Sequence, residues 1–104
     1  MKQHSAEQLK ELRTAARSLY RAMLTLEDPA EVRQFLLDLC TPAELEAMVD
    51  RWWVANLLTE GRSYRDISDI TGVSVTTVGR VARFMSHGEG GYQIALERMN
   101  KENT

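Results

Sequence analysis

The sequence predicts an all-α domain, and three observations support this prediction. Apolar residues recur at steps of three and four along most of the chain, as in amphipathic helices, and no strand-like alternation persists. Proline and glycine stand where several of these segments should begin or end. The 104 residues are 43% hydrophobic and 27% charged, which is ordinary for a folded domain and too apolar for a disordered chain. We therefore expect one helical domain over residues 1–104.

Two helices are predicted before residue 41. The first carries one apolar stripe, whose members are Leu9, Leu12, Ala16, Leu19, Tyr20, Met23 and Leu26. Asp28 and Pro29 then predict an N-cap followed by proline at the first helical position, where its missing N–H is not needed. The short helix that follows has apolar residues along one side, at Val32, Phe35, Leu36 and Leu39.

A third helix is predicted to begin after Thr41 and to end at Gly61. The Thr41 hydroxyl can accept a hydrogen bond from a first-turn amide, while Glu44 reaches back to the amide of the cap residue. Apolar residues form a stripe at first and then become consecutive over residues 52–55, so the helix is apolar on most sides. Because short helices of one chain can hardly cover it, we expect a homodimer. The alternative is the central core helix of a monomer.

Residues 63–86 match a helix-turn-helix pattern. Ser63 and Ser74 are the predicted caps of its two helices, and Gly72 lies in the turn, which needs a residue free to take positive φ. The small Ser68 lets the two helices cross closely. The predicted inner faces are Ile67 and Ile70 in the first helix, and Val75, Val78, Val81 and Ala82 in the second.

A helix-turn-helix places the start of its second helix toward base edges in the major groove. The corresponding residues are Ser74, Thr76, Thr77, Gly79 and Arg80. Threonine methyl groups suit the thymine methyl, and the hydroxyls can bond base edges or phosphates. Arg62 and Arg65, at the start of the first helix, are placed for phosphates and for salt-dependent affinity. The sequence therefore predicts a double-stranded DNA partner. The alternative is a protein–protein interaction module that has lost DNA binding, because the reading face lacks Asn, Gln and Lys.

The C-terminal part is predicted to hold a loop over residues 87–91 and a last short helix over about residues 92–100. The domain then comprises dimerisation helices in residues 1–60, the helix-turn-helix in residues 61–86, and the loop and C-terminal helix in residues 87–104.

Composition excludes several other classes of protein. The net charge of −2 argues against non-specific coating of nucleic acid, although positive charge gathers in residues 1–21 and 61–87. The single cysteine, Cys40, excludes an intramolecular disulfide and, with two histidines, leaves no usual zinc site. No apolar run approaches the ~20 residues that cross a bilayer, and the N-terminus lacks a signal-peptide core, so we expect a cytoplasmic protein with no membrane partner. No nucleophile–base set or pair of carboxylates indicates an enzyme.

The stretch from Thr41 to Ser86 resembles the tryptophan repressor family, in particular its YerC/YecD-type branch. The resemblance rests on CTPAELEAMVDRWWVANLL, on the helix-turn-helix that follows, and on HGEGGY at residues 87–92, and it covers about residues 5–100. It implies an all-helical, intertwined homodimer that acts as a sequence-specific transcriptional regulator, a repressor that occupies its operator. The two recognition helices would then meet successive major grooves about 34 Å apart, the spacing known for helix-turn-helix dimers, the Trp repressor among them.

The resemblance also implies the place of an effector pocket. In the tryptophan-binding members, a threonine and two arginines line the corepressor site, and the matching residues are Thr41, Arg51 and Arg80. Guanidinium planes can stack on an indole, and either can hold a carboxylate. However, Val81 and Phe84 stand where those members have glycine and serine, and both add apolar bulk at the place of the indole. We therefore expect no tryptophan cofactor. A different, smaller corepressor is the alternative, and ion pairing or phosphate contact is the alternative role of both arginines.

Overall fold

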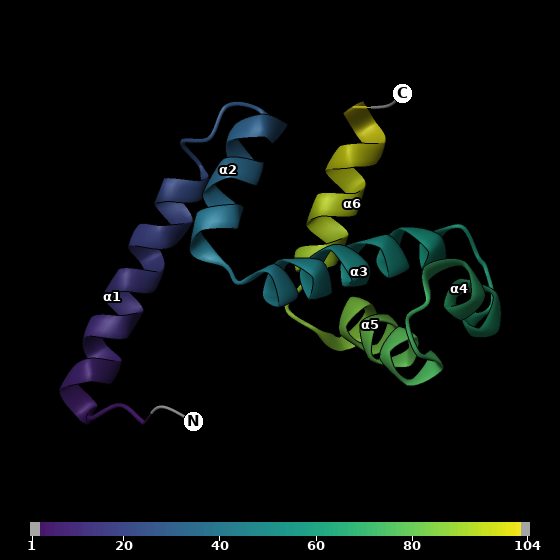
Figure 1. The fold of residues 1–104 in the computed structure, drawn as a ribbon, viewed down its shortest axis with the longest axis horizontal. Helices are drawn as coiled ribbons and strands as arrows, with labels where there is room; N and C mark the ends of the chain where they lie inside the picture. The colour runs from purple at the N-terminus through teal and green to yellow at the C-terminus, as the bar shows by residue number, and fades with distance from the viewer. Residues whose placement is uncertain (1–2, 103–104) are drawn as a thin grey trace. The chain divides into compact units, whose positions relative to one another are not determined.

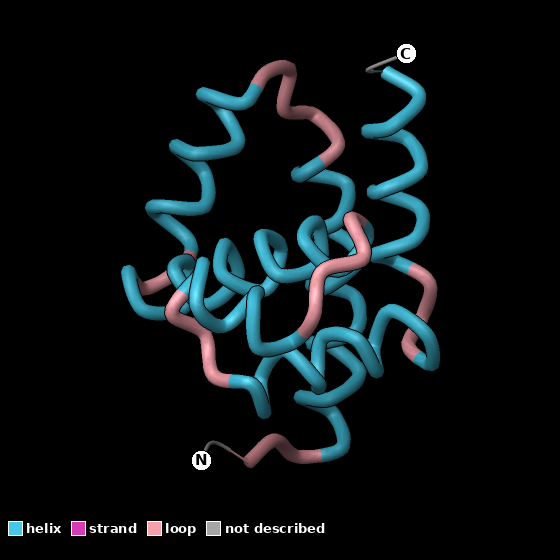
Figure 2. Tube along the Cα trace, turned by 90° about the vertical axis from the view of Figure 1, so that its right-hand side faces the viewer, coloured by secondary structure: helices cyan, strands magenta, loops and turns pink. Residues whose placement is uncertain are grey.

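The computed structural model describes residues 3–102, which form six helices joined by short loops (Figures 1 and 2). In chain order these helices are α1 (Ala6–Met23), α2 (Pro29–Leu39), α3 (Pro42–Thr59), α4 (Tyr64–Thr71), α5 (Val75–His87) and α6 (Gly91–Glu102). No strand occurs in this part of the chain, so the predicted all-α class is confirmed. None of the helices in residues 3–102 is long and apolar enough to cross a membrane.

The chain divides into two compact units, Met1–Thr41 and Pro42–Thr104. In the N-terminal unit, α1 ends at Met23, which is earlier than the predicted stripe reached. The predicted start of α2 is confirmed, because Asp28 Oδ1 accepts a hydrogen bond of 2.9 Å from the Glu31 amide and Pro29 is the first helical residue. No residue of α1 or α2 is buried.

The start of α1 is fixed by a capping box that the sequence analysis did not identify. Ser5 Oγ accepts from the Gln8 amide at 3.1 Å, and the Ser5 amide donates to Gln8 Oε1 at 2.8 Å. This reciprocal pair satisfies two amides that the first turn leaves without partners.

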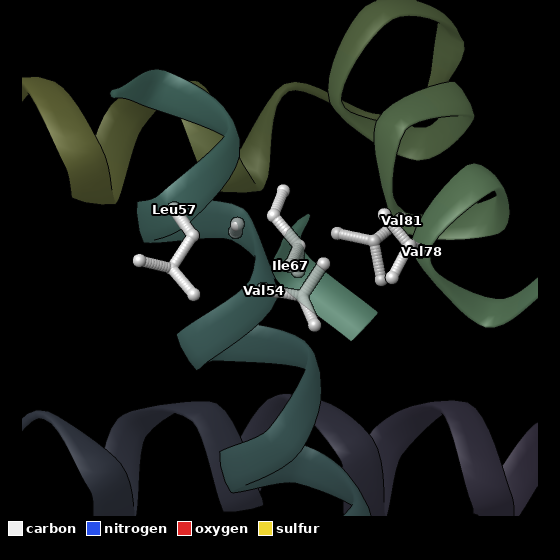
Figure 3. Close-up of a cluster of buried hydrophobic side chains, with 6 residues drawn as sticks. Val54, Leu57, Ile67, Val78 and Val81 are labelled. Atoms are coloured by element: carbon white, nitrogen blue, oxygen red, sulfur yellow. The ribbon is translucent and has the colours of Figure 1, made fainter. Parts of the chain in front are cut away.

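The core of the C-terminal unit lies where α3, α4 and α5 meet (Figure 3). Ile67 of α4 is fully buried, and Figure 3 shows it between side chains of α3 and of α5. The buried residues that form this cluster are Val54, Ala55, Leu57, Ile67, Val78 and Val81. Fully burying a branched side chain of this kind contributes about 1.5–3 kcal/mol. These contacts therefore hold α4 and α5 against α3.

Two residues predicted for the inner face are exposed instead. Ile70 is 41% exposed and Val75 is 50% exposed. Ile70 is the last residue but one of α4 and, unlike Ile67, is not part of the buried cluster. Val75 is the first residue of α5 and lies before the part of that helix that reaches the core.

The connection between α5 and α6 is shorter than predicted. Helix α5 continues to His87 and α6 begins at Gly91, so only residues 88–90 lie outside the two helices. The last helix also extends beyond its predicted end, to Glu102.

Candidate nucleic-acid interface

The two helices predicted on either side of Gly72 are present, and three residues join α4 to α5. Gly72 has φ 78° and ψ 1°, the left-handed conformation that L-residues adopt only with strain. Its amide donates to the Ser68 carbonyl at 2.9 Å, which ends α4, and the Val73 amide donates to Thr71 Oγ1 at 3.0 Å. The turn is thus held by hydrogen bonds from its own backbone. The predicted role of Gly72 is confirmed.

Two of the three predicted hydroxyl residues at the start of α5 bond to each other. Ser74 Oγ accepts from the Thr77 amide at 3.1 Å and donates to Thr77 Oγ1 at 3.0 Å. These two hydroxyls therefore stabilise the helix start, as expected of an N-cap. Thr76 is exposed. Gly79 follows it by three residues and lies half-buried on the same side of α5.

Arg62 is held by two carboxylates. Its Nε lies 3.0 Å from Glu60 Oε1, and its Nη1 lies 3.1 Å from Asp66 Oδ2. The hydrogen bonds that Arg62 donates to Glu60, first, and to Asp66 raise the pKa of Arg62, so the guanidinium stays charged. Since both carboxylates already neutralise it, Arg62 is less available to a phosphate than the sequence suggested.

Three other arginines near the turn are exposed. Arg65 is in the first turn of α4, and Arg80 and Arg83 are in α5. Within residues 3–102, none of the three forms an ion pair. These unpaired cations lie on both helices and favour the binding of a polyanion, because each phosphate contact releases condensed counterions.

A cavity of about 1020 Å³ lies behind the start of α5, between that helix, α3 and the beginning of α6. Arg51 and Arg80, two of the three predicted effector residues, both line it. The third, Thr41, is the last residue of the N-terminal unit, whereas the lining residues all belong to the C-terminal unit. The two predicted arginines thus line the same cavity, together with Ser74 and Thr77 at the start of α5.

Val81 and Phe84 line the cavity in different ways. Val81 is only 2% exposed and belongs to the core, so most of its bulk packs inward. Phe84 lines the cavity as well and is 61% exposed, so its ring is not packed into the core.

Several cavity residues were missed by the sequence analysis. Trp52 of α3 and Tyr92 of α6 stack with ring centroids 6.5 Å apart and planes 6° from parallel, and both line the cavity. Asp50 and Glu89 add carboxylates to the lining. They form two pairs of near neighbours, Asp50 with Trp52 and Glu89 with Tyr92, but the two pairs are far apart in the sequence and no local motif joins them. Only the packing of α6 against α3 and α5 reveals the group.

Comparison with known proteins agrees with this geometry. Residues 14–100 match the Trp repressor protein family. The chain is 37% identical over 86 residues to the uncharacterized protein YerC of Bacillus subtilis (strain 168), and the match covers 83% of each protein.

Two solved structures have a similar fold. A TrpR-like protein from Eubacterium eligens is 38% identical with a TM-score of 0.79, over 84% of this chain and 90% of the other. A candidate Trp repressor from Staphylococcus aureus is 38% identical with a TM-score of 0.80, over 89% of this chain and 94% of the other. The resemblance seen in the sequence is thereby confirmed. The chain belongs to the Trp repressor family of DNA-binding regulators, with YerC among its relatives.

Proposed function

We propose that the protein is a sequence-specific transcriptional regulator without enzymatic activity, which binds double-stranded DNA as a homodimer and represses by occupying an operator. The observation that carries the proposal is the surface of the helix pair around Gly72. There, exposed Thr76 at the start of α5 lies among arginines that no described carboxylate neutralises. The family membership of the chain supports the same conclusion.

Each residue of this surface takes a distinct role. Thr76 reads a base edge, through its methyl group or its hydroxyl. Arg65 and Arg80 contact phosphates, which fix the register and supply salt-dependent affinity. Ser74 and Thr77 are bonded to each other and hold the helix start in place.

Self-association is supported by apolar surface that one chain leaves exposed. No residue of α1 or α2 is buried, although α1 is an 18-residue amphipathic helix that tertiary packing should stabilise. Val49 and Trp53 of α3 are exposed as well. Because isolated apolar faces of this kind are rare on monomers, a second copy of the chain is the proposed cover.

The proposed regulator needs no tryptophan. Phe84 lines the same cavity as Arg51 and Arg80. We propose that its ring competes with an indole for this space. A smaller ligand that leaves the Phe84 ring in place is the alternative.

DNA binding is tested with duplexes enriched from a random pool by the wild-type protein. The affinity for an enriched duplex is measured by fluorescence anisotropy at several salt concentrations. We expect log K to fall linearly with log salt, and Arg65→Ala to reduce the slope by about 1.8, which is about 0.9 for each of the two protomers. Thr76→Ala should weaken binding several-fold without changing the slope, because a base contact carries no counterion release. Arg98→Ala, an exposed arginine of α6, is the control and should change neither.

A folded protein that enriches no duplex even at low salt would contradict DNA binding. If that protein still self-associates, the interaction-module alternative is favoured.

The homodimer is tested by sedimentation equilibrium of the wild-type chain. We expect twice the chain mass of 11.8 kDa, and a shift toward monomer for Trp53→Asp. Ile70→Asp places the same charge on an exposed apolar residue of α4 and should leave the mass unchanged. A concentration-independent monomer would contradict the proposal.

The effector proposal is tested by titrating tryptophan into the wild-type protein and Phe84→Ser in a calorimeter. We expect no binding to the wild type. Saturable binding to the wild type would contradict the proposal.

A further inference from the structure

Gly79 lies inside α5 without a structural reason for being glycine. It is not among the glycines with positive φ, so its backbone is open to any L-residue. A Cβ at this position would meet only the Tyr64 ring, at 3.7 Å from Cε2, which is ordinary van der Waals contact. Glycine in a helix interior is nevertheless unfavourable relative to alanine. The folded chain therefore has room for a side chain that the sequence does not supply.

The Tyr64 ring marks one wall of this open space. Tyr64 is the first residue of α4 and is 44% exposed, so its ring reaches from α4 to the backbone of α5 and remains partly in solvent. Thr76 and Arg83 lie about one turn before and after Gly79, and both are exposed. The notch formed by Tyr64 and Gly79 thus opens on the surface that carries the proposed DNA contacts.

The geometry points to a close approach of the DNA sugar–phosphate backbone at this notch. We propose that a phosphate or deoxyribose lies against Gly79, where the absence of a side chain lets it reach the helix backbone. The Tyr64 hydroxyl donates a hydrogen bond to the phosphate oxygen, a contact that tyrosine side chains supply in protein–DNA interfaces. Charge complementarity supports this occupant, because the neighbouring exposed Arg65 and Arg83 form no ion pair within residues 3–102. The inference rests on the proposed DNA binding; it adds Tyr64 to that site and gives Gly79 a specific role in it.

Two substitutions test the notch separately: one fills the space at Gly79, and the other removes the Tyr64 hydroxyl. Gly79→Ala should leave the melting temperature unchanged or raise it, since alanine favours the helix, while weakening binding to the selected duplex. Tyr64→Phe keeps the ring against Gly79 and removes only the hydroxyl. It should weaken binding by about tenfold for each of the two protomers, the effect of losing a hydrogen bond to a charged acceptor. The salt slope should stay unchanged, because the phenol carries no charge.

Matched controls exist elsewhere in the chain. Gly91→Ala makes the same change in α6, where a Cβ meets nothing within 4 Å, and Tyr20→Phe removes the hydroxyl of an exposed tyrosine in α1. Both should bind as the wild type does. If the wild type binds the duplex and both Gly79→Ala and Tyr64→Phe bind equally well, the notch inference fails alone. If the wild type binds no duplex, the proposed function and this inference fail together.

Discussion

Replacing Ile67 by alanine should destabilise the protein more than replacing any exposed apolar residue of α4. Ile67 is fully buried where α3, α4 and α5 meet. The substitution removes three carbon atoms, which corresponds to about 2.4 kcal/mol at ~0.8 kcal/mol per methylene. The cavity left between the helices adds to this loss, since neighbouring side chains relax only partly. We therefore expect the free energy of unfolding to fall by about 3–4 kcal/mol.

Ile70→Ala is the matched comparison, because it makes the same change three residues away at a side chain that is 41% exposed. Because Ile70 is less buried, we expect the free energy of unfolding to fall by only about 1–1.5 kcal/mol, with little cavity left behind. Both losses are measured by urea unfolding followed by circular dichroism, at one fixed protomer concentration because dimerisation would couple stability to concentration. Equal losses for the two variants would refute the assignment of Ile67 to the centre of the core.

Three further predictions concern local features of the fold. Gly72→Ala should lower the free energy of unfolding by about 1–2 kcal/mol, measured by thermal unfolding, because φ is 78° and no atom lies near the new Cβ, so only backbone strain contributes. Asp28→Ala should cost about 1 kcal/mol in the same measurement through loss of the α2 cap, whereas Asp28→Asn should cost much less; equal losses would contradict a capping role. Tyr92→Leu should change the fluorescence of Trp52 and cost about 1 kcal/mol, because it removes the aromatic stack; an unchanged emission spectrum would contradict the stack.

The starts of several helices could be predicted from the sequence because each depends on residues that are neighbours in the chain. Asp28, Ser63 and Ser74 accept hydrogen bonds from amides three residues further on, and Gly72 provides the turn between α4 and α5. Such local chemistry is visible in a short stretch of sequence. The start of α1 carries the same kind of local signal, a serine with a glutamine three residues later, which the prediction did not include.

Burial and the cavity could not be predicted in the same way. Whether Ile67 or Ile70 faces inward depends on how α4 crosses its neighbours, which helical periodicity leaves open. The cavity combines residues of α3, α5 and α6, and the Trp52–Tyr92 stack joins two helices that are distant in the sequence. The resemblance to a family supplied Arg51 and Arg80 as a pair, which spacing alone would not have joined.

The arrangement of half-sites in duplexes enriched from a random pool is the most direct test of the central claim, that two copies of the α4–α5 pair read DNA together. A dimer of this kind should select a twofold-symmetric sequence whose halves are centred about 10 base pairs apart, one turn of the double helix, the spacing of the family's Trp repressor and other helix-turn-helix dimers. Enriched sequences with a single unpaired half-site, or halves on opposite faces of the duplex, would contradict it.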